Sequence, residues 1–249
     1  MAIPKVIHYT WFGKGEIPEK DLKCIESWKK YCPDYEIICW NEDNYDVNKN
    51  LFIKQAYENR KFAFVSDYAR LDILYNYGGI YFDVDVEVIK NIDSLLEHKG
   101  FFGLGEADGG YYVSCGLGFG AEKKLDFLKD IMEVYENSTF ISENGEINAK
   151  PIPVLTNEIL LNSRGIKFDE NKFYNIDDVV IYPTEYFDPK NYETGKINIT
   201  DNTMTIHHYD GSWIDETAKL YKKYSKIFGE RIASMLVNFI TAFRKGEKK

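Results

Sequence analysis

Two aspartates, Asp83 and Asp85, directly follow the apolar run Ile80 to Phe82. Carboxylate oxygens are the ligands that hard divalent cations prefer. If the run continues as a strand, both side chains lie on one face, because side chains alternate along a strand. The pair therefore predicts a metal site at the end of a buried strand. The alternative for two aspartates at this spacing is a solvated surface pair.

The segment before this strand adds a cation and a third carboxylate. Asp67 and Arg70 lie three residues apart in a helix predicted over residues 62–77, so they share one helix face. Gly78-Gly79 ends this helix and leads into the aspartate pair. The Arg70 guanidinium can bind a phosphate or a sugar hydroxyl, and Asp67 can accept from ribose or sugar hydroxyls. The alternative is an intrahelical ion pair that contributes about 0.2–0.5 kcal/mol.

A second polar cluster follows a late extended run, in TIHHYDGSW at residues 205–213. His207 and His208 are adjacent, so only one of them is expected to face a given site, and the sequence leaves open which. A neutral imidazole is a suitable third ligand for a manganese-type ion. Ser212 and Trp213 offer a hydroxyl and an indole N–H that can donate to phosphate oxygens.

The first predicted strand ends in Thr10, Trp11 and Phe12. Ligands of open α/β sheets bind at the carboxyl ends of strands, so these residues are candidates for nucleotide contact. The ring of Trp11 can stack on a nucleobase. The alternative is a tryptophan buried in the core.

Strand and helix patterns succeed one another along the chain, which favours an α/β layer fold with a mostly parallel mixed sheet flanked by helices. Strands are predicted over residues 5–12, 35–40, 80–82, 86–89, 101–104, 111–119, 179–182 and 204–209, and helices over 18–31, 62–77, 122–136 and 153–163. The aspartate pair and the two histidines then follow strands that lie far apart in the chain.

The composition is that of a folded globular protein and is acidic. The 249 residues include 31 Lys+Arg and 40 Asp+Glu, a net charge of −9, and 44% are hydrophobic. This composition excludes a disordered chain, a collagen and a coiled coil. The acidic balance argues against a nucleic-acid partner bound through bulk charge. A bound phosphate would need a metal ion or a few well-placed cations.

The C-terminal segment differs from the rest in charge. Residues 217–249 carry nine Lys/Arg against two Glu, a net of +7, together with regularly spaced apolar residues. Two domains are therefore predicted, a main domain over 1–216 and a basic amphipathic helical tail over 217–249. Such a helix can lie on an anionic membrane surface, or it can pack on the core with its lysines in solvent.

Cysteine use and the N-terminus indicate a cytoplasmic protein. The four cysteines, Cys24, Cys32, Cys39 and Cys115, form no CxxC pair and are expected to be reduced thiols. The first residues contain no basic segment followed by a long apolar stretch, so no signal peptide is expected. No run of about 18 apolar residues is present to span a membrane. The tail allows peripheral attachment to the inner face of a membrane.

Three blocks resemble the DXD-containing sugar transferases of glycosyltransferase family 32. They are IPKVIHYTWFG at residues 3–13, FAFVSDYARLDILYNYGGIYFDVDVE at 62–87 and IHHYDGSW at 206–213, in that order. The resemblance implies a GT-A fold (a Rossmann-like α/β fold), a nucleotide-sugar donor, a divalent metal (Mn²⁺ or Mg²⁺) and retention of anomeric configuration. It also implies a glycan or lipid-linked oligosaccharide acceptor, in capsular polysaccharide or lipopolysaccharide assembly. A uridine diphosphate donor carrying galactose or glucose is expected, with guanosine diphosphate donors left open.

The resemblance also assigns roles by position. It implies that Trp11 stacks on the base with Thr10 and Phe12 beside it, and that Asp67 and Arg70 bind ribose, sugar or phosphates. Asp83 would contact both ribose and metal, and Asp85 would bind the metal directly, so Asp83, Asp85 and Arg70 are the catalytic candidates. The remaining assignments are metal binding by His207 or His208 and diphosphate binding by Ser212 and Trp213.

Two other functions compete with this interpretation. A haloacid-dehalogenase-like phosphatase uses an apolar strand followed by D-x-D, which IYFDVDVEV fits loosely, and Asp177-Asp178 would imitate its late acidic pair. That interpretation leaves Asp67, Arg70 and the IHHYDGSW block without a role. A non-catalytic sugar- or nucleotide-binding module would use the aromatic residues but has little need for two paired aspartates.

Overall fold

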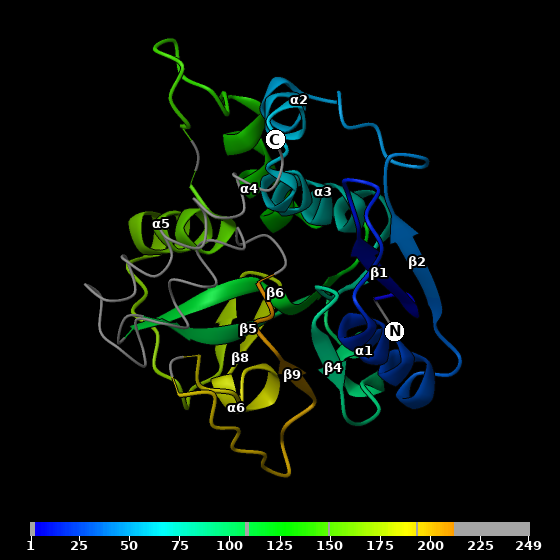
Figure 1. Cartoon of the computed structure of the whole chain (residues 1–249). Helices are drawn as coiled ribbons and strands as arrows, with labels where there is room; N and C mark the ends of the chain where they lie inside the picture. The colour runs from blue at the N-terminus through cyan, green and yellow to red at the C-terminus, as the bar shows by residue number, and fades with distance from the viewer. Residues whose placement is uncertain (1–2, 108–109, 149, 193, 212–249) are drawn as a thin grey trace, which may run out of the picture. The chain divides into compact units, whose positions relative to one another are not determined.

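The computed structural model describes residues 3–107, 110–148, 150–192 and 194–211 (Figure 1). The chain divides into two units, Met1–Tyr209 and Asp210–Lys249. All elements described below belong to the first unit. The predicted tail over 217–249 lies outside the described residues, as do Ser212 and Trp213.

A seven-stranded mixed sheet, in the order β2-β1-β3-β6-β5-β8-β7, forms the centre of the first unit. Its strands are β1 (Val6–Thr10), β2 (Glu36–Trp40), β3 (Gly79–Tyr81), β5 (Gly100–Ala107), β6 (Gly110–Ala121), β7 (Tyr174–Ile176) and β8 (Val179–Tyr182). Strand β1 pairs in parallel with β2 and β3, and β5 pairs in parallel with β8. The other three pairings are antiparallel. The predicted α/β class with a mixed sheet is confirmed, but the prediction that the sheet is mostly parallel is wrong, because only three of its six described pairings are parallel.

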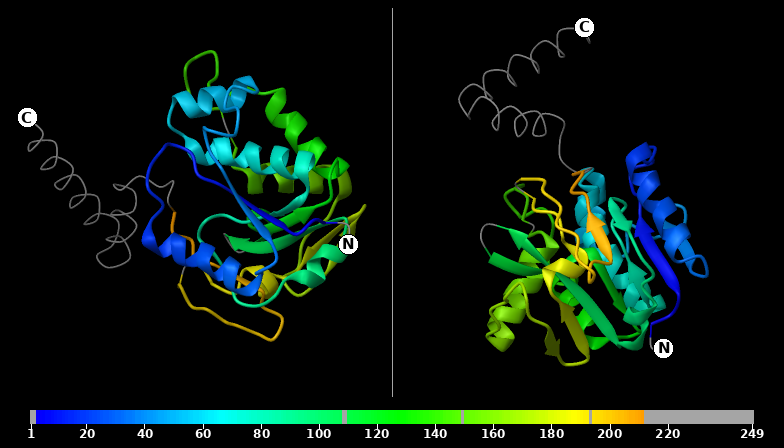
Figure 2. Two further views of the ribbon diagram at one scale, coloured as in Figure 1. Left: turned by 90° about the vertical axis from the view of Figure 1, so that its right-hand side faces the viewer. Right: turned by 90° about the horizontal axis from the view of Figure 1, so that it is seen from below.

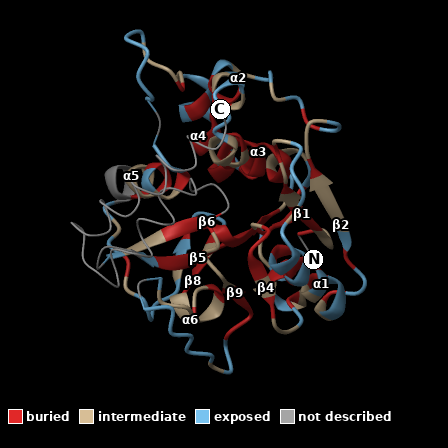
Figure 3. Ribbon diagram, viewed as in Figure 1, coloured by how far each residue is buried: buried red, intermediate tan, exposed pale blue. Residues whose placement is uncertain are grey.

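Helices cover both faces of this sheet (Figure 2). They are α1 (Glu19–Tyr31), α2 (Leu51–Glu58), α3 (Phe62–Tyr77), α4 (Asp126–Glu136), α5 (Ile152–Arg164), α6 (Thr184–Phe187) and the 3₁₀ helix η1 (Asp93–Glu97). Successive strand residues point to opposite faces. In β3, Tyr81 joins the core formed with α2 to α5, whereas Ile80 joins the core formed with α1 and η1. Burial is concentrated in the strands and in α3 (Figure 3).

Strands β4 (Val86–Val88) and β9 (Thr205–His207) form a separate two-stranded antiparallel sheet. Its register places Val86 opposite His207. Helix α1 anchors β4, because Trp28 Nε1 donates to the Val86 carbonyl at 2.7 Å and the Val88 N–H donates to Ser27 Oγ at 2.9 Å. This small sheet brings the late histidine segment to the aspartate pair.

The observed elements agree with the predicted ones at most positions. The helix over 62–77 and the strand over 179–182 have the predicted bounds. Helix α2 was not predicted, although Asn50 caps it by accepting from the Ile53 N–H at 2.9 Å. The predicted strand over 204–209 is shorter, since β9 ends at His207. Within the described residues, none of the helices has the length and apolar character required to cross a membrane.

Candidate metal centre

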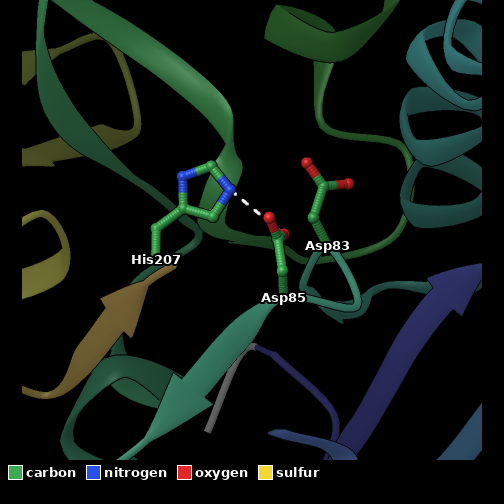
Figure 4. Close-up of side chains that lie close together, drawn as sticks. All are labelled: Asp83, Asp85 and His207. Carbon is green, nitrogen blue, oxygen red and sulfur yellow. Dashed lines mark hydrogen bonds and ion pairs between the residues drawn. The ribbon is translucent and has the colours of Figure 1, made fainter. Parts of the chain in front are cut away.

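Asp83 and Asp85 lie in a turn between β3 and β4, so the strand before them does not continue through the pair. The Val86 N–H donates to the Asp83 carbonyl at 3.0 Å, which closes a four-residue turn. Asp is favoured at the first position of such turns. The turn still directs both carboxylates to the same place (Figure 4). The grouping of the two carboxylates follows from this turn and not from strand alternation.

His207 from β9 completes the cluster. One ligand atom each from Asp83, Asp85 and His207 lie within 4.8 Å of one another. His207 Nε2 is 3.1 Å from Asp85 Oδ1, and the two side chains are only 14% and 12% exposed. His208 turns elsewhere, with its Nε2 2.9 Å from Glu87 Oε2. The structure therefore brings His207, and not His208, to the aspartates.

The three side chains fit a divalent cation. Ligands at about 2.1 Å in octahedral geometry lie about 3 Å apart when adjacent, and the separation between His207 Nε2 and Asp85 Oδ1 is 3.1 Å. Carboxylate oxygens with one imidazole suit manganese or magnesium. His207 Nδ1 is buried and has no hydrogen-bond partner among the described residues. Nε2 faces Asp85 Oδ1 and is the ring nitrogen placed for coordination beside that carboxylate.

Arg70 lies between two of the carboxylates. Its Nη2 is 3.1 Å from Asp67 Oδ1 and 3.3 Å from Asp83 Oδ1, and its Nη1 donates to Asp83 Oδ2 at 3.3 Å. Its Nε donates to the Ser66 carbonyl at 3.1 Å, and the guanidinium packs over the Tyr81 ring at 4.9 Å. The two residues share one helix face as predicted, and the ion pair that was the alternative for this spacing is present. The guanidinium also orients Asp83.

Burial and neighbouring charges shift the pKa values of this cluster in opposite directions. Burial raises the pKa of Asp67 to about 6, and Arg70 opposes the shift. Burial likewise raises the pKa of Asp83 against the pull of Arg70. Burial is the largest single effect on His207 and lowers its pKa, but the charge and hydrogen bond of Asp85, together with the charges of Asp83 and Asp188, raise the net pKa. A bound dication would favour the ionised carboxylates and so relieve the cost of holding them together.

The carboxyl ends of β1 and β3 meet next to this cluster. Thr10 Oγ1 is 2.8 Å from Tyr81 Oη and 2.9 Å from Ser66 Oγ. Tyr81 Oη in turn donates to Asp83 Oδ1 at 3.2 Å. Thr10 is therefore linked to the aspartates through Tyr81, as expected for neighbouring parallel strands that end at the same edge.

The three residues at the end of the first strand have different environments. Phe12 is buried and packs edge-on against Tyr45, with ring centroids 5.8 Å apart. Trp11 is half-buried, and its Nε1 donates to the Gly15 carbonyl at 2.6 Å. Of the two aromatic candidates, Trp11 is the one with a ring accessible for stacking on a base.

Two contributors to the cluster were not recognised in the sequence. Tyr81 was expected only to bury its strand, but its hydroxyl contacts Asp83. Gly116, on β6, leaves the space that the Asp83 carboxylate occupies, because a Cβ there would lie 2.4 Å from Asp83 Oδ2. The order of β3 and β6 in the sheet sets this contact, and no local sequence pattern reports it.

Comparison with known proteins gives several similar fungal enzymes, among them the following two. Inositol phosphoceramide mannosyltransferase 3 of Schizosaccharomyces pombe is 37% identical over 101 residues, covering 39% of this chain and 28% of that protein. Mannosyl phosphorylinositol ceramide synthase CSH1 of Saccharomyces cerevisiae is 36% identical over 107 residues, covering 40% of this chain and 27% of that protein. The similarity thus spans less than a third of either relative.

One solved structure and one family model are also similar to this chain. The PaToxG glycosyltransferase superposes with a TM-score of 0.49 and 19% identity, over 66% of this chain and 70% of that chain. The family model for the glycosyltransferase sugar-binding region containing DXD motif matches residues 18–102, which include Asp67, Arg70, Asp83 and Asp85. The resemblance predicted from the sequence is confirmed over residues 18–102, which are similar to the sugar-binding region of the DXD-containing glycosyltransferases.

Proposed function

We propose that this chain is a metal-dependent, retaining glycosyltransferase that moves a hexose from a nucleotide-diphosphate sugar to a glycan or lipid-linked oligosaccharide acceptor. The observation that supports this most directly is the convergence of Asp83, Asp85 and His207 within 4.8 Å. Two of these residues lie in the segment that matches the DXD family model.

The cluster is suited to binding a diphosphate in an acidic protein. When bound, a Mn²⁺ or Mg²⁺ ion supplies positive charge that stabilises the leaving diphosphate. His207 would hold the ion from β9, and Asp83 and Asp85 would hold it from the turn before β4. Arg70 and Tyr81 keep the Asp83 carboxylate in place. Trp11 provides the ring for the base, and we assign diphosphate contacts to Ser212 and Trp213 on sequence grounds.

Retention of configuration is part of the proposal. The acceptor hydroxyl attacks the anomeric carbon on the face that the leaving group vacates, and the departing phosphate oxygen takes the hydroxyl proton. Arg70 contacts Asp67, Asp83 and the Ser66 carbonyl, so we assign it to orienting Asp83. The role of a direct phosphate ligand, which the resemblance implies for Arg70, is not needed in this arrangement.

Different hexose donors follow from the sequence resemblance and from the names of the fungal relatives. The resemblance favours UDP-galactose or UDP-glucose, whereas the two fungal relatives carry mannosyl transfer in their names. We therefore propose a hexose donor and treat UDP-galactose, UDP-glucose and GDP-mannose as the three to compare.

We also propose a cytoplasmic site of action in surface polysaccharide synthesis. The basic tail over 217–249 would bring the enzyme to an anionic membrane that carries a lipid-linked acceptor. Flotation with vesicles containing an anionic lipid tests this. Association that is unchanged after deletion of residues 217–249 would exclude the tail as the anchor.

The competing phosphatase interpretation gains no support. Its late acidic pair, Asp177-Asp178, lies in the turn between β7 and β8, and Asp178 pairs with Lys99 at 3.1 Å. Strand β8 is three places away from β3 in the sheet. The pair is therefore not part of the Asp83 cluster.

The experiment is a screen of the three donors for stabilisation and for release of nucleoside diphosphate, each with Mn²⁺ and with chelator. We expect one donor to raise the melting temperature and to be turned over only with Mn²⁺, since a ligand at a hundredfold excess over its Kd stabilises by about 2.7 kcal/mol. Hydrolysis of p-nitrophenyl phosphate without donor turnover would favour a phosphatase. Metal-independent sugar binding without turnover would favour a binding module.

A further inference from the structure

The His207 ring is packed against an aromatic side chain that the proposed function does not use. The ring centroids of His207 and Tyr209 are 4.2 Å apart, and the planes are tilted by 52°. Tyr209 follows β9 by two residues, and its backbone has φ of +56°, in the left-handed region. That conformation costs a non-glycine residue about 1–2 kcal/mol. The fold therefore maintains a strained backbone that places this ring on the imidazole.

The Tyr209 ring is fixed at its far end. Its hydroxyl donates to Asp188, with distances of 2.6 and 2.7 Å to the two carboxylate oxygens. Asp188 is held in turn, because its N–H donates to the Thr184 carbonyl at 2.7 Å and it accepts from the Glu106 N–H at 3.4 Å. A continuous series of contacts thus runs from the C-terminal end of α6, through Tyr209, to the imidazole.

The imidazole needs such support. Histidines that bind metals usually donate their second ring N–H to a carboxylate or a carbonyl, which fixes the ring. His207 Nδ1 has no such partner among the described residues, although it is buried. Packing against Tyr209 restricts rotation of the His207 ring and so helps to keep Nε2 facing Asp85.

We propose that Tyr209 and Asp188 are positioning residues for metal binding, and that they act through His207. This inference rests on the proposed function, in which His207 is a metal ligand. The Asp188 carboxylate fixes the Tyr209 hydroxyl, and the Tyr209 ring holds the imidazole with Nε2 toward Asp85. Neither residue contacts the ion itself.

The test is the Mn²⁺ affinity of the full chain, measured by electron paramagnetic resonance of free Mn²⁺. Tyr209→Phe keeps the ring and removes its anchor, and Asp188→Asn removes the charged acceptor. We expect each variant to weaken Mn²⁺ binding about tenfold, the lower end of effects for residues behind a ligand. Tyr192→Phe is the matched control, since Tyr192 packs on the same Tyr209 ring at 5.1 Å and is 43% exposed. We expect that variant to bind Mn²⁺ like the wild type.

A double-mutant cycle separates positioning from general structural loss. In a His207→Asn background, the same two substitutions should leave the residual Mn²⁺ affinity unchanged, because the side chain that they position is gone. Urea unfolding of the metal-free chains identifies a variant that is merely misfolded, and the other variant then carries the test. Full wild-type affinity in both variants, or equal losses with and without His207, would overturn the inference alone. A wild-type chain that binds no Mn²⁺ would overturn the proposed metal site together with it.

Discussion

His207 Nε2 lies 3.1 Å from Asp85 Oδ1, although the two residues are 122 positions apart in the chain. The pairing of β4 with β9 produces this proximity, because its register sets His207 opposite Val86, the residue after Asp85. Helix α1 holds β4 in place through Trp28. The candidate metal centre is therefore assembled from the small second sheet and from the turn that follows β3.

The two adjacent histidines should differ in effect. Replacing His207 by Gln removes the ring beside Asp85, and we expect Mn²⁺ affinity to fall by 10- to 100-fold, or about 1.4–2.7 kcal/mol. Replacing His208 by Gln removes its contact with Glu87, and we expect the Mn²⁺ affinity to change by less than about threefold. Calorimetric titration with Mn²⁺ measures both. A larger loss for the His208 variant would reverse the assignment.

Gly116 provides a steric test of the position of Asp83. A methyl group at this site would lie 2.4 Å from Asp83 Oδ2, so Gly116→Ala must displace the carboxylate or β6. We expect at least a tenfold loss of Mn²⁺ affinity and a destabilisation of about 1–3 kcal/mol from overpacking. Gly15→Ala is the control, because an added Cβ there meets no atom within 4 Å. Equal Mn²⁺ affinities for the two variants would show that Asp83 needs no such space.

Buried His8 should make the stability pH-dependent. Trp40 Nε1 donates to His8 Nδ1 at 3.0 Å, so Nε2 carries the proton that is shared with the Gly78 carbonyl at 2.9 Å. Burial lowers the pKa of His8 to about 4, against the unfolded value of 6.5. Between these values the unfolded chain binds a proton that the folded chain does not, so this histidine makes the free energy of unfolding fall as the pH drops.

The comparison with His8→Gln isolates this effect. Asp67 and Asp188 have raised pKa values, so they make the free energy of unfolding rise as the pH drops, opposite to His8. They do so equally in the wild type and in the variant. Between pH 7 and pH 4, we expect the free energy of unfolding to fall by up to about 3 kcal/mol more in the wild type than in the variant. Urea unfolding at several pH values measures the difference, and parallel curves for the two proteins would contradict this explanation.

Local patterns in the sequence predicted most of the fold. Helix α3 has the predicted bounds because Gly78, with φ of +67°, ends it as a glycine stop does. Helix α2 was missed although Asn50 is a good cap, because its eight residues give a short periodic signal. Strands β5 and β6 are longer than predicted, because the glycines near their ends were interpreted as turn residues. In the sheet these glycines leave room for large side chains, as Gly120 does for Phe101.

The site was predictable in its residue types but not in its contacts. The spacing of Asp67 and Arg70 predicted that they share one helix face, with an ion pair as the alternative, because helical geometry is local. The choice between His207 and His208 depends on the register of β4 with β9, and the role of Gly116 depends on β6 lying beside β3. Both depend on long-range pairing, which no local pattern encodes.

The most direct test of the proposed function is Mn²⁺-dependent turnover of the best donor by the wild type and by Asp85→Ala. Glu87→Gln is the matched control, since Glu87 lies two residues away and its carboxylate contacts His208 instead of the cluster. We expect the Asp85 variant to lose about 10³-fold in turnover, or about 4 kcal/mol of transition-state stabilisation, and the Glu87 variant to remain close to the wild type. Turnover by the Asp85 variant near the wild-type rate with Mn²⁺ present would contradict a metal-dependent site at this position.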